Sequence, residues 1–397
     1  MYYLNDLGIL CNLGRDGVSI GKALLQSKQA LPAPQTLFYQ SGPYRVGGIP
    51  GHLPGLPASL ARHECRNNRL ALAALTQLEN SIEAALSRYG RQRIGVVMAT
   101  STAGIDSTQQ AVEAVFEYGS TPVGFDAIVG THGGLGEFVA DYLQLQGPVF
   151  TLSTACSSSG NALLSARRLL RLGLCDAVIT GGVDTLCELT LQGFGALEAQ
   201  SATYNRPFAT CRDGINIGEA AGIYLLSREP STIEFKGGAG SSDAHHISAP
   251  HPQGDGAFAA MYDALIDANL NAGDIGYLNL HGTGTFHNDS AESRAVNRLF
   301  GQNLPCSSTK AFTGHCLGAA SALESGICWL LLNAAGNKQT GIRLPPSAYP
   351  DERDDTLAPI ALTGHNERLN HTLRYCMSNS FAFGGNNVSI ILGRSHG

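Results

Sequence analysis

Apolar residues occur along this chain in two kinds of segment, and each kind predicts a different structural element. Short runs rich in valine and isoleucine at residues 93–100, 149–154 and 177–180 are typical of buried strands. Longer segments at residues 67–89 and 159–172 carry leucine or alanine every three or four positions, as amphipathic helices do. Strands that alternate with helices in this order predict an α/β fold.

The same rhythm begins again after residues 227–233, where an Arg-Glu-Pro-Ser-Thr stretch interrupts the apolar pattern. The second part of the chain has predicted strands and helices in a similar order, at residues 233–238, 256–268, 276–280, 290–300, 320–332, 373–378 and 387–392. We therefore expect two halves of similar organisation, residues 1–228 and residues 229–397.

Composition narrows the class of protein. Apolar residues make up 43% of the chain and charged residues only 15%, which excludes a disordered chain and favours a large buried core. The net charge of −6 makes nucleic acid an unexpected partner. No run of 18 apolar residues predicts a membrane span, and the first eleven residues do not read as a signal peptide. Ten cysteines are too few for a disulfide scaffold, so we expect reduced thiols in the cytoplasm.

One cysteine, Cys156, lies where the predicted strand at 149–154 gives way to the predicted helix at 159–172. Backbone N–H groups and the helix dipole at such a position favour a thiolate, and a sharp turn would lift the sulfur above the sheet. The alternative is a small packing cysteine. The other cysteines lack this context, and we expect all of them to be packing residues: Cys11, Cys65, Cys175, Cys187, Cys211, Cys306, Cys316, Cys328 and Cys376.

A histidine, His281, directly follows the predicted strand at 276–280 and begins the sequence His-Gly-Thr-Gly-Thr. Ligands of α/β proteins bind at the carboxyl ends of strands, so this imidazole is a candidate general base or hydrogen-bond donor. The alternative is an ordinary turn histidine. His287 and Asp289 are close in sequence, but their spacing matches no metal-binding signature, and neither does that of the histidine-rich residues 245–251. We expect no metal.

Two further segments carry candidate chemistry. Lys310 and His315 precede the apolar helix predicted at 320–332, where a cation and an imidazole suit an anion or a developing oxyanion. Glu324 is a lone carboxylate on that helix and needs a partner if it is buried. Lys310 is the candidate partner, and a solvated helix face is the alternative. Near the C-terminus, the sequence Phe-Ala-Phe-Gly-Gly at 381–385 is either half of an oxyanion hole or a glycine-rich hairpin.

The order of these four motifs resembles the β-ketoacyl-acyl-carrier-protein synthases of types I and II, in the thiolase-like superfamily, over roughly residues 2–393. The resemblance implies an α/β fold built as a five-layered αβαβα sandwich of two similar halves. The first half would carry the nucleophilic cysteine and the second both catalytic histidines. Residues 65–68 and 246–254 look closest to ketosynthases of bacterial aryl polyene pathways.

The resemblance also implies the catalytic roles. Cys156 would accept an acyl group from a carrier protein, and malonyl carrier protein would then lose carbon dioxide and attack that acyl group. His281 and His315 would stabilise the enolate, while Lys310 would organise the site through Glu324. The chain would thus be an acyltransferase that elongates a polyene or fatty acyl chain.

Other positions match the family's substrate-binding residues. Phe383 is expected to offer its backbone N–H to a second oxyanion, beside that of Cys156, and to gate the site. An ungapped alignment puts Thr108, with Asp106 close by, where fatty-acid synthases often carry a bulky residue at the acyl pocket, and this smaller lining would suit a conjugated polyene. The expected substrate-binding residues are Thr283, Thr285, Thr108, Phe381 and Gly384. Ser321 and Asn386 are two small departures from the family pattern.

The implied partner is an acyl carrier protein, which brings its own 4′-phosphopantetheine, so we expect no resident cofactor. Four arginines are candidates for the carrier surface, with ordinary ion-paired arginines as the alternative: Arg66, Arg69, Arg206 and Arg212. The dimer partner is either a second copy or a chain-length-factor-like subunit without a nucleophile. The motifs argue against three other classes: a chain-length factor itself, a degradative thiolase or type III synthase, and a metal hydrolase.

Overall fold

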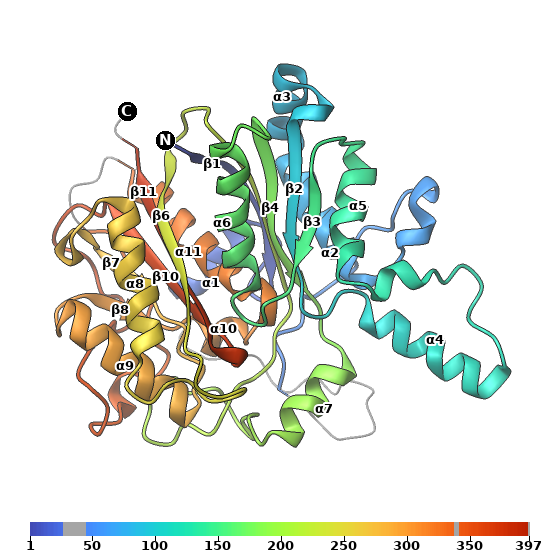
Figure 1. The fold of residues 1–397 in the computed structure, drawn as a ribbon. Coiled ribbons are helices and arrows are strands. Elements are labelled where there is room, and N and C mark those ends of the chain that lie inside the picture. The colour runs from blue at the N-terminus through green and yellow to red at the C-terminus, as the bar shows by residue number, and fades with distance from the viewer. Residues whose placement is uncertain (27–44, 337–340, 396–397) are drawn as a thin grey trace.

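Eleven strands form one continuous sheet in the part of the chain that the computed structural model describes, residues 1–26, 45–336 and 341–395 (Figure 1). The strand order is β3-β2-β4-β5-β1-β6-β11-β10-β7-β8-β9. Between β1 and β6 the sheet is joined only by the pairing of Tyr3 with Glu234. The sheet therefore divides naturally into two stretches at this point.

The first stretch contains five strands. Antiparallel pairs join β5 (Ala220–Ser227) to both β1 (Tyr3–Cys11) and β4 (Ala177–Asp184). Parallel pairs join β2 (Ile94–Ala99) to both β4 and β3 (Val149–Leu152). All residues of β2, β4 and β5 are buried, which explains why their sequences are apolar without alternation.

The second stretch repeats this pairing pattern. Antiparallel pairs join β11 (Asn386–Arg394) to both β6 (Ile233–Ser242) and β10 (Tyr375–Phe381). Parallel pairs join β7 (Tyr277–Asn279) to both β10 and β8 (Pro305–Ser307), and a short strand β9 (Ala361–Leu362) follows β8. The repetition confirms the prediction of two similar halves.

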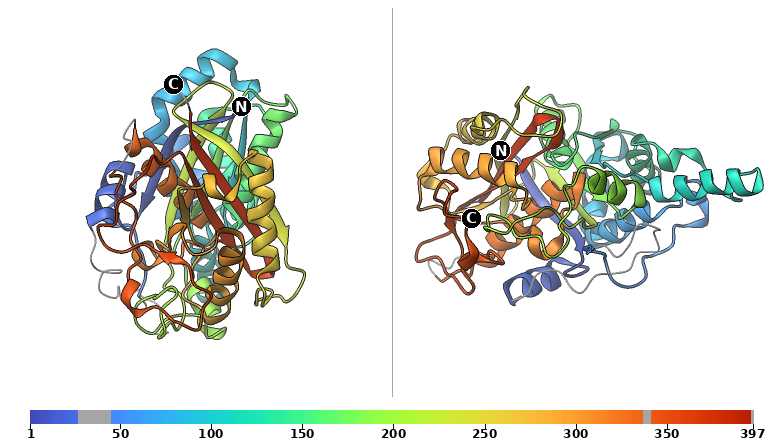
Figure 2. Two further views of the ribbon diagram at one scale, coloured as in Figure 1. Left: turned by 90° about the vertical axis from the view of Figure 1, so that its left-hand side faces the viewer. Right: turned by 90° about the horizontal axis from the view of Figure 1, so that it is seen from below.

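The helices form three layers, one between the two stretches of the sheet and one on each outer face (Figure 2). Two helices lie between the stretches and contact strands of both, and two pairs cover the outer faces. The inner pair is α6 (Ser158–Arg171) and α11 (Ala320–Ala335), the first outer pair is α2 (Arg66–Leu75) and α5 (Gly133–Leu143), and the second is α8 (Asp255–Ala268) and α9 (Phe286–Phe300). Three helical layers and two sheet layers make the predicted five-layered sandwich.

The remaining α-helices lie at the ends and edges of these layers, and Figure 1 shows α4 projecting away from the sheet. They are α1 (Gly17–Gln26), α3 (Glu79–Tyr89), α4 (Ile105–Tyr118), α7 (Glu188–Ala196) and the single turn α10 (Lys310–Thr313). The periodicity of the sequence did not reveal α4, α7 or α10.

Two predicted elements differ from the structure in an instructive way. The single helix predicted over 67–89 is divided into α2 and α3 by a 3₁₀ turn at Thr76–Leu78, where the Gln77 amide binds the backbone of Ile9 in β1. The strand predicted over 177–180 continues to Asp184. A Cβ on Gly182 would lie 2.6 Å from Cβ of Ser159 in α6, so glycine allows the strand to pass beneath that helix.

One helical segment, Leu317–Ala335, is long and apolar enough to cross a membrane by length and composition. However, 78% of its 18-residue window is buried inside the protein. The segment contains α11, which packs between the two stretches of the sheet and contacts β5, β10 and β11. Its apolar character is therefore explained by its place in the core.

Candidate active site

Cys156 lies at the predicted elbow between β3 and α6. The preceding residue, Ala155, has a positive φ of 51°, which turns the chain sharply before the helix begins. The backbone N–H of Thr154 donates to Oγ of Ser158, and the Ser158 hydroxyl donates back to the carbonyl of Ala155. These bonds fix the turn, so the position of the sulfur is set by the local sequence.

The elbow faces a cavity of about 430 Å³. Cys156, His281 and His315 contribute to its wall, together with the aromatic rings of Phe194 in α7, Phe381 at the end of β10 and Phe383 in the 3₁₀ turn that follows. The ring centroids of Phe194 and Phe383 are 5.7 Å apart. Four of the five predicted substrate-binding residues also line this cavity: Thr283, Thr285, Phe381 and Gly384.

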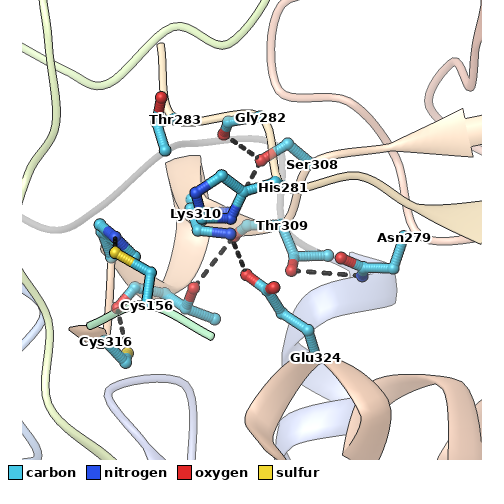
Figure 3. A network of polar contacts seen from close by, with 12 residues as sticks. Cys156, Asn279, His281, Gly282, Thr283, Ser308, Thr309, Lys310, Cys316 and Glu324 are labelled. Atoms are coloured by element: carbon cyan, nitrogen blue, oxygen red, sulfur yellow. Dashed lines mark hydrogen bonds and ion pairs between the residues drawn. The ribbon is translucent and has the colours of Figure 1, made fainter. Parts of the chain in front are cut away.

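The three principal groups come from distant parts of the sequence. Nε2 of His315 lies 2.9 Å from Sγ of Cys156, and the ring centroids of His315 and His281 are 5.5 Å apart at an angle of 81°. Figure 3 shows His281 near Cys156 with Lys310 beside it. The structure therefore brings together the cysteine of one half and both histidines of the other, as the sequence predicted.

Both imidazoles are neutral in the folded protein. Burial lowers the pKa of His281 and of His315 well below 6.5, and the positive charge of Lys310 lowers both further. A neutral imidazole carries one N–H, so each ring can donate one hydrogen bond to an oxyanion without holding a full positive charge. Such preorganised donors stabilise charge that develops in a buried site.

The prediction that the helix N-terminus favours a thiolate at Cys156 is wrong for the free protein. Burial raises the pKa of this thiol to about 11, although the charge of Lys310 and the backbone N–H groups of Phe383 and Cys156 oppose the rise. The resting sulfur is therefore a thiol. Those same two N–H groups point toward the sulfur, where they could also receive the oxygen of an acyl group bound to it.

Behind the histidines lies a buried ion pair. Nζ of Lys310 in α10 contacts a carboxylate oxygen of Glu324 in α11, and both side chains are 1% exposed (Figure 3). Burial raises the pKa of Glu324, and Lys310 opposes this rise. Lys310 is thus the predicted partner of Glu324, and a solvated helix face is excluded.

Two carboxylates of α9 support the His-Gly-Thr-Gly-Thr loop, and sequence reasoning assigned them no such role. Glu292 accepts hydrogen bonds from the N–H groups of His281 (2.8 Å) and Gly282 (2.7 Å). Asp289 accepts from the N–H of Gly284 at 3.1 Å. The helix was predicted to start only at residue 290, whereas it starts at Phe286. With the correct start, the spacing of three residues would have placed both carboxylates on one face near the loop.

Thr108 is the predicted substrate-binding residue that the structure does not bring to the cavity. It lies in α4, and its hydroxyl donates to the carbonyl of Gly104. It is absent from the described wall of the cavity, so a single chain gives it no contact with an acyl group there. The ungapped alignment therefore did not predict the surroundings of Thr108.

The four arginines that were candidates for the carrier surface are ordinary ion-paired arginines, as the alternative interpretation predicted. Arg66 pairs with the buried Glu219, Arg69 with Glu64, Arg206 with Glu352, and Arg212 with Asp354 at 2.6 Å.

Among the cysteines, Cys211 is exposed, which contradicts its prediction as a packing residue, while the other eight packing candidates are buried.

The possible metal-ligand atoms of Cys156, His281 and His315 also lie within 4.8 Å of one another. In the described part of the chain, no other cluster of histidine, cysteine and acidic residues could hold a metal ion in this way. Thiolate and imidazole are ligand types that zinc accepts. The candidates with His287 and Asp289, or within residues 245–251, form no such group in the described chain. A metal here would bind the nucleophile itself.

A buried thiol, two neutral imidazoles and converging backbone N–H groups define a condensing acyltransferase. Two family models match the chain: the N-terminal domain of β-ketoacyl synthase over residues 55–231 and its C-terminal domain over residues 233–337. The chain belongs to the β-ketoacyl synthase family, and its fold is the thiolase-like fold of ketosynthases.

Individual proteins agree with this assignment. Nodulation protein E from Rhizobium meliloti (strain 1021) is 32% identical over 408 residues, covering 97% of each chain. The 3-oxoacyl-[acyl-carrier-protein] synthase 2 of Staphylococcus aureus is 31% identical over 354 residues, covering 83% of this chain and 84% of its own. The solved ketosynthase ApeO, in complex with its chain length factor ApeC from Xenorhabdus doucetiae, is 44% identical. It aligns over 99% of this chain and 98% of that chain, with a TM-score of 0.93.

Proposed function

We propose that this β-ketoacyl synthase joins malonyl carrier protein to an acyl group held on Cys156, in a decarboxylative Claisen condensation. The observation that carries the proposal is the approach of His315 Nε2 to within 2.9 Å of the Cys156 sulfur. His281 lies beside this pair, and all three residues line one cavity. The division of labour between residues 1–228 and residues 229–397 is part of the proposal, because each half contributes different groups.

In the first step the acyl group moves to the enzyme. Sγ of Cys156 bonds to the acyl carbon, the bond to the pantetheine sulfur breaks, and the proton of the Cys156 thiol ends on the released pantetheine thiol. The oxygen of the tetrahedral intermediate carries negative charge. The N–H groups of Cys156 and Phe383 point toward the sulfur and are placed to donate to that oxygen.

In the second step malonyl carrier protein enters and loses carbon dioxide. The electron pair of the broken carbon–carbon bond forms an enolate, whose oxygen needs hydrogen-bond donors. The neutral imidazoles of His281 and His315 can supply them, and the Lys310 charge adds a favourable potential. The buried pairing of Lys310 with Glu324 supports an organising role for Lys310.

In the third step the enolate carbon attacks the acyl carbon on Cys156. The bond from sulfur to the acyl carbon breaks and its electron pair stays on the sulfur, which takes up a proton from water to restore the Cys156 thiol. The product leaves as a β-ketoacyl carrier protein two carbons longer than the primer. The oxyanion of this step occupies the same pair of backbone donors as in the first step. Phe383 lines the cavity beside Gly384 and Gly385, in keeping with its proposed gating role.

We propose a polyene or related fatty acyl chain as the substrate. Thr108 gives no support for this choice, but the aromatic rings of Phe194, Phe381 and Phe383 in the cavity wall do, because flat conjugated chains stack on such rings. Acylation of Cys156 with polyenoyl and saturated thioesters of equal length tests the choice. Faster acylation by the polyenoyl chain is expected, and equal rates would refute it.

The proposed partners are an acyl carrier protein and a second ketosynthase-like subunit. ApeO was solved with its chain length factor, which supports a heterodimer for this chain too. Among the residues that the structure describes, no strand pairs with the outer edge of β3, and the nearby helix α4 exposes Val112, Val115, Phe116 and Tyr118. A homodimer remains the second form. Size-exclusion chromatography of the chain alone and after co-expression with such a subunit distinguishes the two forms.

We further propose that the enzyme acts in the cytoplasm without a resident cofactor. All ten cysteines are free thiols, which suits a reducing compartment. The proposed chemistry uses only side chains and backbone N–H groups of this chain.

A condensation assay tests the proposed function. The protein is incubated with acyl primers and malonyl carrier protein, alone and with a chain-length-factor-like subunit, and products are measured by intact mass. A two-carbon extension that requires Cys156 is expected. If neither preparation extends any primer, the proposed function is refuted.

A further inference from the structure

Asp184 is a buried carboxylate that the proposed reaction steps do not use. It is the last residue of β4 and is 0% exposed. Its Oδ1 atom accepts hydrogen bonds from the backbone N–H groups of Ser101 and Thr102, both at 2.7 Å, and from the hydroxyls of Thr100 and Thr102, both at 2.8 Å. Its Oδ2 atom accepts a hydrogen bond from the backbone N–H of Ala319 at 3.0 Å. These donors compensate the cost of burying the carboxylate and hold it in one place.

The two oxygens of Asp184 bind different halves of the chain. The donors to Oδ1 belong to residues 100–102, in the half that carries Cys156. The donor to Oδ2 belongs to the 3₁₀ turn Leu317–Ala319, which follows His315 in the half that carries both histidines. The carboxylate therefore joins the two halves directly beside a proposed catalytic group.

The turn after His315 lies closely against this carboxylate. Leu317 has a positive φ of 49°, which is uncommon for a residue other than glycine. A Cβ on Gly318 would lie 2.7 Å from Oδ2 of Asp184 and 2.6 Å from Oγ of Ser101, so glycine permits an approach that a larger residue would oppose. The turn thus has little room to shift while the carboxylate holds it.

Asp184 complements the support that His315 receives from another segment. The backbone N–H of His315 donates to the carbonyl of Asn216 at 2.7 Å, and the carbonyl of His315 accepts from the N–H of Gly218 at 3.0 Å. These bonds hold His315 itself, whereas Asp184 holds the turn that follows it. The segment that carries the imidazole is therefore fixed at two points.

We propose that Asp184 is a positioning residue, whose carboxylate fixes the turn after His315 and so sets the approach of the His315 imidazole to the Cys156 sulfur. The inference rests on the proposed function, in which His315 donates to the enolate formed by decarboxylation. Acylation instead uses the backbone N–H groups of Cys156 and Phe383, which lie outside this turn. Loss of the carboxylate should therefore slow decarboxylation more than acylation.

Two substitutions release the turn from the carboxylate in different ways. Asp184→Asn keeps the size of the side chain but replaces one oxygen by an NH₂ group, which cannot accept a hydrogen bond. Gly318→Ala keeps the carboxylate and forces the turn away from it, because the added Cβ would lie too close to Oδ2. Thr102→Val is the matched control, since it removes a hydroxyl that donates to Oδ1 and leaves the bond between Oδ2 and Ala319.

The test measures the two steps separately, with circular dichroism as a check on folding. Acylation of Cys156 by acyl carrier protein is followed by intact mass, and decarboxylation of malonyl carrier protein by release of carbon dioxide. In Asp184→Asn and in Gly318→Ala, decarboxylation should fall about tenfold or more, while acylation stays within about threefold of the wild type. Thr102→Val should leave the ratio of the two rates within about twofold of the wild-type ratio, because the turn stays bound to the carboxylate.

A double-mutant cycle separates positioning from a general loss of stability. Because Asp184 acts through His315, adding Asp184→Asn to His315→Ala should lower decarboxylation by less than about twofold further. A purely structural role would instead make the two losses multiply.

Three outcomes would overturn the positioning role of Asp184: equal losses in acylation and decarboxylation, full decarboxylation in both Asp184→Asn and Gly318→Ala, or losses that multiply in the double mutant. If Asp184→Asn does not fold, Gly318→Ala decides by the same measurements, alone and combined with His315→Ala. A wild-type protein that neither acylates Cys156 nor decarboxylates malonyl carrier protein would refute the proposed function instead.

Discussion

Cys156 and Cys65 occupy comparable places in the fold but have different surroundings. Both are buried, Cys65 as the N-cap of α2 and Cys156 just before α6. Burial raises the pKa of each thiol to about 11. A position at a helix N-terminus therefore does not by itself produce a reactive thiolate, because the desolvation of the charged sulfur outweighs the favourable backbone dipoles.

The difference between the two cysteines lies in what faces the sulfur. Backbone N–H groups of Asn67 and Asn68 point to the sulfur of Cys65, which lies near the ion pair of Glu64 with Arg69. Cys156 instead faces an imidazole at 2.9 Å, a second imidazole beside it and the charge of Lys310. The comparison teaches that the catalytic cysteine is defined by its partners from the other half of the chain.

The largest expected effect separates the two cysteines directly. Cys156→Ala should lower the condensation rate by at least about 1000-fold, because no other group can carry the acyl chain. Cys65→Ala should retain activity within about threefold. Initial rates with matched protein concentrations provide the measurement, and a comparable loss in the two variants would remove the distinction.

The next largest effect concerns the imidazoles. His281→Ala and His315→Ala should each lower the condensation rate by about 100- to 1000-fold, the loss typical of one oxyanion donor. The exposed His371→Ala serves as the control and should behave like the wild type. Rates of malonyl decarboxylation, measured as carbon dioxide release, provide the second readout. Full decarboxylation in both active-site variants would contradict the proposed roles.

A smaller effect should follow from removing the charge of Lys310. Because this charge lowers the pKa of Cys156, Lys310→Met should raise that pKa and slow alkylation by iodoacetamide at fixed pH, by roughly tenfold for each unit of rise. Lys310→Met combined with Glu324→Gln avoids a lone buried carboxylate and should show a smaller slowing, because the charge of Glu324 raises the pKa of Cys156. The alkylation rate against pH, followed by peptide mass, gives the result. An unchanged profile at Cys156 would show that Lys310 does not act on the sulfur.

The smallest effect is on stability and comes from Glu292, the carboxylate behind His281. Burial raises its pKa from 4.5 to about 7, so between these values the folded protein binds more protons than the unfolded chain. The free energy of unfolding should therefore fall as the pH rises from 4.5 to 7, by on the order of 3 kcal/mol from this group. Glu292→Gln should flatten that part of the pH profile in urea unfolding. Glu117→Gln on exposed α4 is the control, and an unchanged slope in Glu292→Gln would contradict the assignment.

Much of this site could be predicted because its residues follow local signals. The elbow at Cys156, the position of His281 after β7 and the pairing of Lys310 with Glu324 all depend on neighbouring sequence and on the cost of burying a lone charge. The repeated strand and helix pattern likewise predicted two similar halves.

Other features depend on contacts that the sequence does not display. The raised pKa of Cys156 results from its burial, and the position of Thr108 depends on the direction of α4, whose apolar residues Val112, Val115 and Phe116 are exposed. In both cases the feature depends on contacts between segments that are distant in the sequence, and the local sequence pattern does not reveal such contacts. The support of Gly284 by Asp289 was missed because a helix start was placed four residues too late.

The most direct test of the central claim is to locate the acyl group in the enzyme before any condensation occurs. The wild-type protein is incubated with acyl carrier protein in the absence of malonyl carrier protein, digested, and its peptides are examined by mass spectrometry. The account predicts one acyl adduct, on the peptide that contains Cys156. An adduct on Cys65 instead, or a protein that condenses substrates without any adduct on Cys156, would contradict it.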